Sequence, residues 1–600
     1  MRCHFSVRPR RSHFVICAAG VASTVLAFAC PIAAVAADAE GTADQHLRVA
    51  LTNPKGDAHV WVQSSLERIY PKTQPGTSAS LTIEAARNQR LSFQVGLRND
   101  TLYPARAECL TTATPDFHVR IRRVGYVPMD HLTIGTDPSE LEGVSNVPGL
   151  VPDPLFPETT ATLGPKETQA FWVTVDVPTT ATPGSYNLPI DVLFTTDHTR
   201  VSVSSQINVH EFTIQPRRNF PVTHWWRPSS IWNWYGMEPW SDEWFAVTRN
   251  YLKDMVDHGS NVVLVNTIEM RRELFRHPNQ MLRITRDGDT YHFDYSTVKR
   301  FVDMAKECGM EYFEWPHLWL YWGVDNPMPI YKNPGKSEEL FFSTNGGGFS
   351  PEYINFLKQY LASLHDFLQS EGILEKSYFH LSDEPGGGGH YDRYKKARGI
   401  LKEIAPWMKV MDALSLLDYG KNGVTDIPVP SIHTAKSFAE AGIFHWAYYC
   451  CSPTGNYLNR FMDTPLAKIR MSGWLFYRLG ASGFLHWGYN YWDALEKDQP
   501  LDPYYHGDAL RWPEIPYGDP FVVYPGVNGP NDSIRWEIFA ESLQDFAMLQ
   551  TAGIKRDDPL LAPILDYDKF PKSESWLLET IEKILKGRGG NSAESTSTGK

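Results

Sequence analysis

The sequence predicts two folded regions in series, an N-terminal β-sandwich followed by a (β/α)8 barrel of the TIM type. Between residues 46 and 216, short segments alternate apolar and polar residues and are separated by clusters of Pro, Gly, Asn and Asp. Between residues 220 and 555, apolar runs alternate with amphipathic helical stretches, as in parallel βα units. A length of 600 residues is also too great for one ordinary domain.

Residues 1–36 predict a signal peptide. Four arginines among the first eleven residues precede an apolar stretch, residues 14–29, and Ala34-Val35-Ala36 supplies a small-residue cleavage site. We therefore expect the mature protein to be exported to the periplasm, the cell surface or the medium. No later apolar run is long enough to cross a membrane.

Four cysteines remain after the predicted cleavage, too few for a disulfide scaffold in so long a chain: Cys109, Cys308, Cys450 and Cys451. The adjacent pair Cys450-Cys451 cannot form a disulfide without a strained turn.

The sandwich is predicted from seven strand-like segments: HVWVQ, SASLTIEAA, QRLSFQVGLR, HVRIRRVGYV, QAFWVTVDVP, SYNLPIDVLF and RVSVSSQINVHEFTI. Short strands without a convincing helix indicate an antiparallel sandwich. Residues 136–162, rich in Pro and Gly, predict a long surface loop. Because no acids or histidines group together in a catalytic pattern, we expect this region to be a scaffold.

The barrel is predicted to contain eight strands and about eight helices. The strand candidates are residues 222–226, 261–266, 312–316, 378–382, 409–413, 427–432, 444–451 and 483–489. The helix candidates are residues 242–258, 296–308, 351–370, 390–404, short pieces around Asp418 and Phe438, 465–479 and 533–549. Residues 556–600 predict one further helix, 574–585, and a disordered tail.

Asp383 and Glu384 are the strongest indication of chemistry in the sequence. They follow the fourth strand candidate, and a proline with four glycines separates them from the next helix. Catalytic residues of (β/α)8 barrels lie at the C-terminal ends of the strands, so we interpret the pair as catalytic. The structural alternative is a helix N-cap whose acids favour the helix dipole.

A second, separate carboxylate is missing from its usual place. Ordinary retaining glycosidases use a nucleophilic carboxylate about 5–5.5 Å from the acid/base, yet the seventh strand candidate, FHWAYYCCSP, contains no Asp or Glu. Three explanations stay open. Another strand end supplies the carboxylate (Glu314, Asp412 and Asp493 are available), the mechanism inverts, or a 2-acetamido group of the substrate is the nucleophile.

The third explanation needs one general acid/base and one carboxylate that orients the acetamido group. Two neighbouring acids at one strand end can perform these two tasks. Close carboxylates repel each other, so that one of them keeps its proton and can act as the acid.

Aromatic clusters after two other strands predict a saccharide site. The segments EWPHLWLYWG (314–323) and HWGYNYWD (486–493) offer rings that stack on sugars and polar groups that bind hydroxyls. Any single ring is equally explained as core. The candidate substrate-binding residues are His317, Trp322, His380, Tyr448, Trp487, Tyr489, Asn490 and Trp492. Of these, we expect His380 to orient the acids rather than to react.

The composition excludes some other functions. A net charge of −12 without a basic run argues against a nucleic-acid partner. No His, Cys, Asp or Glu group has recognisable metal-ligand spacing, so we predict no metal and no cofactor. The expected partner is a glycan or oligosaccharide, and the sequence does not indicate an oligomeric state.

Several long segments resemble the catalytic domain of glycoside hydrolase family 123, also catalogued as domain-of-unknown-function family 4091. They are HLSDEP, the run from Tyr448 to Trp492, and SIRWEIFAESLQDFAML. VWVQSSLERIYP and AARNQRLSFQVGLR resemble the sandwich that precedes that domain, so the resemblance covers nearly the whole mature chain. The run Ala540-Glu541-Ser542 departs from the Arg-Asp-Gly-like run expected there.

The resemblance implies a β-N-acetylgalactosaminidase with substrate-assisted, retaining catalysis. Asp383 would position the acetamido group, and Glu384 would be the general acid/base. The leading hypothesis is thus an exported glycosidase acting on a β-linked N-acetylhexosamine, with N-acetylgalactosamine favoured. The alternatives are a barrel glycosidase on a sugar without the acetamido group, using Glu314 or Asp412 as second carboxylate, and a non-catalytic saccharide-binding protein. The two repelling acids disfavour the binding protein.

Overall fold

The structure is a computed structural model that describes residues 58–112, 117–195, 198–270, 278–332, 339–495, 497 and 499–589. The predicted signal peptide, residues 46–57 of the predicted sandwich and the end of the predicted tail lie outside these ranges.

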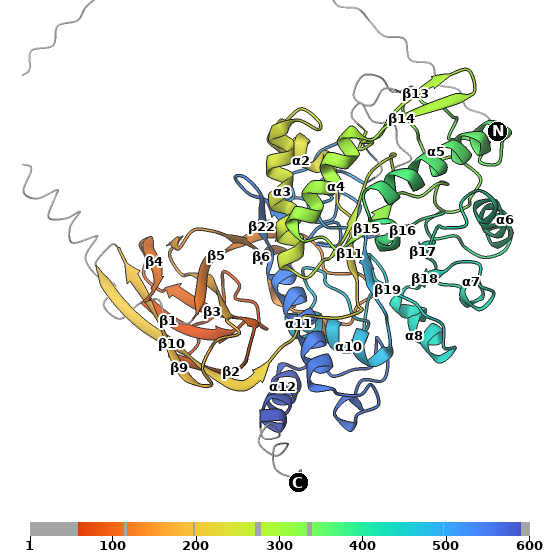
Figure 1. The fold of residues 1–600 in the computed structure, drawn as a ribbon. Helices are drawn as coiled ribbons and strands as arrows, with labels where there is room; N and C mark the ends of the chain where they lie inside the picture. The colour runs from red at the N-terminus through yellow and green to blue at the C-terminus, as the bar shows by residue number, and fades with distance from the viewer. Residues whose placement is uncertain are drawn as a thin grey trace, which may run out of the picture. The chain divides into compact units, whose positions relative to one another are not determined.

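Two five-stranded sheets form the N-terminal region (Figure 1). The first contains, in spatial order, β1 (Ala58–Ser64), β3 (Gln89–Asn99), β8 (Glu167–Val177), β5 (His118–Met129) and β6 (Gly149–Phe156). The second contains β2 (Ser80–Arg87), β10 (Thr199–Thr213), β9 (Gly184–Phe194), β4 (Ala105–Thr111) and β7 (Thr160–Leu163). Strand pairs are antiparallel except for β2 with β10, which is parallel.

The alternating sequence pattern produces the core of this region. In β10, Val203, Ile207 and Val209 are buried and join a cluster with Phe93 and Phe171. Residues between the buried positions of β10 are more exposed, because successive side chains of a strand point to opposite faces of the sheet.

The predicted loop at 136–162 is wrong in its second half, where the chain forms β6 and β7. Pro152 and Pro154 of β6 gave the segment its loop-like composition. β6 is the last strand of its sheet, the position at which a sheet tolerates proline.

The C-terminal region contains a parallel strand at each of the eight predicted positions. Six form one sheet in the order β16 (Ser377–Phe379), β15 (Tyr312–Trp315), β12 (Val262–Leu264), β11 (Val222–His224), β20 (Phe484–His486) and β19 (Ala447–Tyr448). The other two, β17 (Met411–Ala413) and β18 (Ile427–Val429), form a separate parallel pair. The continuous sheet is thus an open, six-stranded parallel sheet, and the closed (β/α)8 barrel stays a prediction.

Helices surround these strands (Figure 1). They are α2 (Pro228–Tyr235), α3 (Asp242–Asp257), α4 (Ser296–Cys308), α5 (Pro351–Ser370), α6 (Gly389–Ile404), α7 (Leu417–Lys421), α8 (Ile432–Glu440), α9 (Leu466–Arg470), α10 (Ser472–Leu479), α11 (Ile534–Ala552) and α12 (Glu574–Gly589). Helices α3, α5 and α11 begin within one residue of their predicted starts, and a serine caps each of them. Ser241, Ser350 and Ser533 each accept a hydrogen bond from a backbone N–H in the first turn of α3, α5 and α11.

Three elements of this region were not predicted: α2, the hairpin of β13 (Arg283–Asp287) with β14 (Thr290–Asp294), and the hairpin of β21 (Val523–Pro525) with β22 (Pro530–Asp532). No helix in the described ranges is both long enough and apolar enough to traverse a lipid bilayer.

Helix α11 joins the two regions. The guanidinium of Arg535 donates to both carboxylate oxygens of Asp153 on β6, each at 2.9 Å, and both side chains are fully buried. The run Ala540-Glu541-Ser542 also lies on this buried helix, and burial raises the pKa of Glu541 to about 7 although it accepts a hydrogen bond from Arg470. The departure from the family pattern therefore lies at a helix-packing position.

Candidate active site

The Asp383-Glu384 pair follows β16 and precedes α6. Its backbone is held from two sides, because the Trp322 N–H donates to the Asp383 carbonyl at 3.0 Å and the Glu384 N–H donates to the Ala413 carbonyl at 3.0 Å. Glu384 has a φ of +44°, in the left-handed region. For a residue other than glycine this conformation costs on the order of 1–3 kcal/mol and is typical of functional sites.

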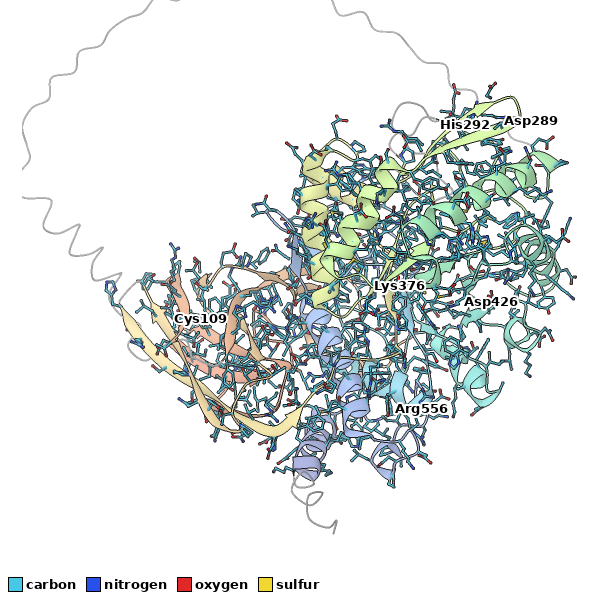
Figure 2. All side chains as sticks on the ribbon, viewed as in Figure 1. Cys109, Asp289, His292, Lys376, Asp426 and Arg556 are labelled. Atoms are coloured by element: carbon cyan, nitrogen blue, oxygen red, sulfur yellow. The ribbon has the colours of Figure 1, made fainter. Side chains whose placement is uncertain are left out.

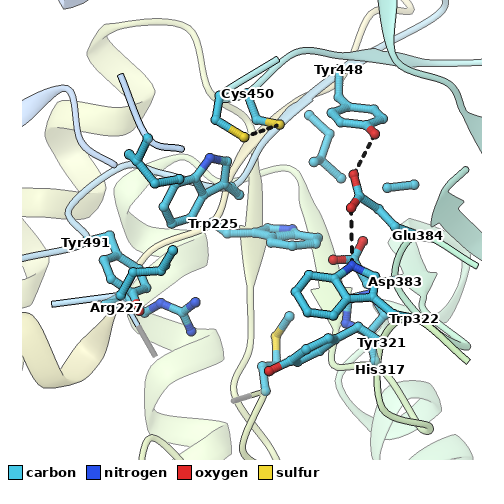
Figure 3. A pocket seen from close by; sticks show the side chains of 17 residues that line it. Trp225, Arg227, His317, Tyr321, Trp322, Asp383, Glu384, Tyr448, Cys450 and Tyr491 are labelled. Carbon is cyan, nitrogen blue, oxygen red and sulfur yellow. Dashed lines mark hydrogen bonds between the residues drawn. The ribbon is translucent and has the colours of Figure 1, made fainter. Parts of the chain in front are cut away.

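Two donors hold the carboxylate of Glu384 (Figure 3). The Tyr448 hydroxyl donates to Oε1 at 2.6 Å, and the Trp322 indole Nε1 donates to Oε2 at 3.3 Å. Burial and the charge of Glu384 raise the pKa of Tyr448 well above its usual value, so this hydroxyl stays protonated and remains a donor.

Asp383 carries the shifted pKa of the pair. Burial and the neighbouring charge of Glu384 raise it well above the ordinary range, against the opposing charge of His380. The pair therefore retains one proton at a pH where isolated carboxyl groups have lost theirs, and in the unliganded protein this proton resides on Asp383.

A pocket of about 240 Å³ opens in front of the pair (Figure 3). Much of its wall consists of the aromatic side chains of Trp225, Tyr321, Trp322, Trp487 and Tyr491, to which Tyr448 adds a sixth ring. Its other lining residues are Arg227, Met270, His317, Asp383, Glu384, Ala413, Tyr448, Cys450, Cys451, Leu485, Leu495 and Ile515. Aromatic faces with a few polar groups are the surface that a sugar requires.

A buried polar network centred on His380 lies behind the pocket. Its Nε2 is 2.6 Å from Glu314 Oε1, and its Nδ1 is 3.2 Å from Asp412 Oδ1. Burial alone would lower the pKa of His380, but hydrogen bonds and charges of the two carboxylates raise it to about 10. His380 is therefore a cation near neutral pH, and it favours the ionised forms of the acids around it.

The carboxylates of Glu314 and Asp412 also accept hydrogen bonds from other donors. Glu314 accepts from the Thr223 hydroxyl at 2.5 Å and from the Trp225 indole at 2.6 Å. Asp412 accepts from the Tyr394 hydroxyl at 2.5 Å and from the Leu381 N–H at 3.0 Å. Glu314, Asp412 and the third alternative, Asp493, are buried and do not line the pocket.

Two groups of residues bring three ligand-type atoms within 4.8 Å of one another: His317-His380-Asp412 and Asp254-His258-Asp532. In the first, both ring nitrogens of His380 already face carboxylates. In the second, Arg122 forms an ion pair with Asp532, and His258 Nδ1 lies 3.0 Å from Asp254. The contacts of His380 and His258 with carboxylates are those of buried ion-pair networks.

Of the ten residues predicted for the site, six line the pocket: His317, Trp322, Asp383, Glu384, Tyr448 and Trp487. Of the other four, His380 orients Glu314 and Asp412 from below the pocket. Tyr489 donates to Asp254 at 2.5 Å, Asn490 exchanges hydrogen bonds with the backbone of Arg227, and Trp492 donates to the Val523 carbonyl at 3.1 Å. The structure does not bring these four to the pocket.

The pocket residues that the sequence reasoning missed include Trp225, Arg227, Tyr321 and Tyr491. Trp225 directly follows β11 in the sequence, so a strand-end search applied to the first strand would have found it. In the segment 486–493, the strand ends at His486, and strand alternation therefore does not apply beyond it. The ring centroids of Trp487 and Tyr491 lie 5.1 Å apart, whereas Tyr489 donates to Asp254 and does not line the pocket.

Comparison with known protein families identifies the family to which this chain belongs. The model of the glycoside hydrolase 123 catalytic domain matches residues 225–552, and that of the glycoside hydrolase 123 N-terminal domain matches residues 64–193. This chain belongs to glycoside hydrolase family 123. As a family 123 member it is a glycosidase, and its substrate is a glycan.

One solved structure shares the fold of this chain. A family 123 glycoside hydrolase from Clostridium perfringens, solved in a study of glycolipid glycan hydrolysis, is 15% identical, with a TM-score of 0.67 over 88% of this chain and 98% of that one. A β-glucuronidase from Parabacteroides merdae matches with a TM-score of 0.30 and 10% identity over 81% of this chain and 52% of its own. A search of curated proteins gave no match.

Proposed function

We propose that this family 123 enzyme removes a β-linked N-acetylhexosamine, in particular N-acetylgalactosamine, with retention of configuration and with the substrate acetamido group as nucleophile. The carrying observation is that Asp383 and Glu384 are the only acids among the described residues lining the pocket. A protein nucleophile would require a separate carboxylate about 5–5.5 Å across the sugar. The three candidates for that role do not line the pocket.

We assign a different role to each of the two acids from its position in the pocket. Trp322, which holds Glu384, is 55% exposed at the rim, where the leaving group departs. We therefore assign to Glu384 proton donation to the glycosidic oxygen. Asp383 accepts the acetamido N–H, so that the acetamido oxygen attacks the anomeric carbon and an oxazolinium-type intermediate forms.

The shared proton must change place when substrate binds. An amide N–H against Asp383 favours its ionised form, and loss of its proton makes protonated Glu384 the stable partner. After the first step, Glu384 is a base that deprotonates water, and attack of this water on the anomeric carbon regenerates the acetamido group with net retention.

The size of the pocket supports a single terminal sugar as its occupant. Its volume of about 240 Å³ is smaller than typical drug-sized ligand sites of roughly 300–1,000 Å³. We propose a glycan of the kind carried by glycolipids, as named for the Clostridium perfringens relative. We also propose export after signal-peptide removal, as the sequence predicts.

We further propose that β17 and β18 complete a closed (β/α)8 barrel. Isolated parallel bridges between Phe379 and Val410 and between Ser431 and Tyr448 support this closure, because they join the pair to β16 and to β19. In such a barrel, the acids occupy the C-terminal mouth.

Hydrolysis of aryl N-acetyl-β-galactosaminide beside the matching aryl β-galactoside tests the proposal. We expect chromophore release from the acetamido substrate alone, because the galactoside carries no nucleophile. Comparable turnover of both would contradict substrate assistance. An N-acetyl-β-glucosaminide in the same assay reports the preference at the sugar 4-position.

A further inference from the structure

Two adjacent thiols, Cys450 and Cys451, form part of the wall of the active-site pocket. Their Sγ atoms are 3.7 Å apart, and both residues are partly exposed (Figure 3). The other cysteines in the described ranges are buried: Cys109 inside the sandwich (Figure 2) and Cys308 at the end of α4. The accessible thiols of the described chain are therefore the two beside the catalytic acids.

We propose that Cys450-Cys451 is a redox modification site at which a low-molecular-weight disulfide closes the pair into a vicinal disulfide and thereby lowers glycosidase activity. The covalent change is independent of the function proposed above. Only its effect on turnover rests on that function.

The chemistry is thiol–disulfide exchange. One protein thiolate attacks a sulfur of the small disulfide, forms a mixed disulfide and releases one small thiolate. The second protein thiolate then attacks the protein sulfur of the mixed disulfide and releases the other. The protein loses two electrons and two protons, and the small disulfide is reduced to two thiols.

The geometry makes the bond attainable and easily reversed. The sulfur atoms must approach from 3.7 Å to about 2.05 Å, which requires side-chain rotation together with a twist of the peptide between the two residues. Adjacent Cα atoms lie about 3.8 Å apart, below the roughly 4.4–6.8 Å of ordinary disulfides. A bond in this position is strained, and strained, exposed disulfides are the readily reduced ones.

Formation of the disulfide would affect Glu384 through the backbone segment that carries Cys450 and Cys451. Tyr448, which donates to Glu384 at 2.6 Å, lies two residues before Cys450. The Cys450 N–H donates to the Ser452 carbonyl at 3.1 Å, and the Cys450 carbonyl accepts from Asn459 at 2.8 Å. Rotating the Cys450-Cys451 peptide changes these contacts, the position of the Tyr448 hydroxyl and the shape of the pocket wall.

The surroundings of Cys450 determine how fast the exchange proceeds. The hydrogen bond with Cys451, burial, and the negative charges of Asp519 and Glu384 raise the pKa of Cys450 well above its ordinary value. Little of it is thiolate near neutral pH, so we expect closure to be faster at alkaline pH.

The test is to incubate the purified protein with oxidised glutathione and to follow peptide masses and hydrolysis together. We expect the peptide containing both cysteines to lose two hydrogen atoms and the hydrolysis rate to fall about tenfold, the size of one lost hydrogen bond to a charged group. Dithiothreitol should restore both. The double variant Cys450→Ser/Cys451→Ser should show the same rate with and without oxidant, and Cys308→Ser should respond like the wild type.

Two results would overturn the proposal: a pair that stays reduced or acquires only glutathione adducts, or a complete internal disulfide with unchanged hydrolysis. The peptide mass does not depend on which glycoside is cleaved. A failure of the proposed substrate is therefore distinguishable from a failure of disulfide formation, and the rate is measured on whichever aryl glycoside the enzyme turns over.

Discussion

Four carboxylates lie near one histidine cation, and they form two pairs. Asp383 and Glu384 face the pocket, whereas Glu314 and Asp412 are buried around His380. Glu314 and Asp412 lie within strands β15 and β17, whereas Asp383 and Glu384 follow β16. What separates the two pairs is access to the pocket, because internal donors surround the buried pair and open space lies in front of the pocket pair. A carboxylate of the parallel region is therefore a candidate for catalysis only where it reaches a pocket.

The largest effect is expected for Glu384→Gln. Removing the acid/base should reduce kcat/KM by roughly 10²–10⁴-fold for a natural disaccharide. The loss should shrink with a dinitrophenyl leaving group, which needs little protonation. Because water attack still requires a base, this rescue should be partial. Steady-state kinetics on both substrates check this, and an equal loss on both would show that Glu384 is not the acid.

On the buried side, Asp412→Asn should reduce stability. The substitution leaves the His380 cation with one anionic partner fewer, and breaking a buried ion pair typically costs about 3–5 kcal/mol. Urea unfolding measures this cost, with the exposed acid Asp418 as matched control through Asp418→Asn. If Asp412→Asn and Asp418→Asn are equally stable, the ion pair between Asp412 and His380 does not stabilise the fold.

Tyr448→Phe should produce a smaller loss of activity. It removes one hydrogen bond to the charged Glu384, worth about 1.5–3 kcal/mol, and should therefore lower kcat about 10–100-fold while the fold persists. Steady-state kinetics measure this loss, and an unchanged kcat would show that the Tyr448 hydroxyl does not act through Glu384.

The smallest effect is expected on stability, from Asp383→Asn. Because the folded protein raises the pKa of Asp383, this group contributes most to stability below its unfolded pKa of about 3.9, and the contribution is lost as the pH rises through the folded value. The variant should therefore unfold at a higher temperature than wild type at pH 7 and at the same temperature at pH 3. A destabilised variant at pH 7 would place Asp383 with the structural acids.

Much of the fold was predictable because it follows from local patterns. Amphipathic patterns located α3 and α5, and apolar runs located all eight parallel strands. Strand β6 was missed because the acceptability of its prolines depends on its edge position, which only the tertiary structure determines. No local signal predicted whether the strand pair β17–β18 joins the larger sheet.

In the site, the acids were predictable from their place after a strand, and their different environments were not. Asp412 is enclosed by Tyr394 and His380, which lie 18 and 32 residues before it in the chain, whereas Asp383 lines the pocket. Tyr489 was predicted with the aromatic cluster 486–493, but its hydroxyl binds Asp254 and its ring does not line the pocket. Contacts between distant segments, not the spacing of residues, decided these cases.

Binding of a thiazoline mimic of the cyclised intermediate tests the central claim most directly. If the acetamido group is the nucleophile and Asp383 holds it, wild type should bind the thiazoline at least 10²-fold more tightly than N-acetylgalactosamine, since an analogue of the reacting state gains the full complementarity of the site. Asp383→Asn should lose most of this advantage, and its slow hydrolysis should not recover with a dinitrophenyl leaving group. Wild-type binding of the thiazoline no tighter than of the sugar, or equally tight binding by Asp383→Asn, would contradict the account.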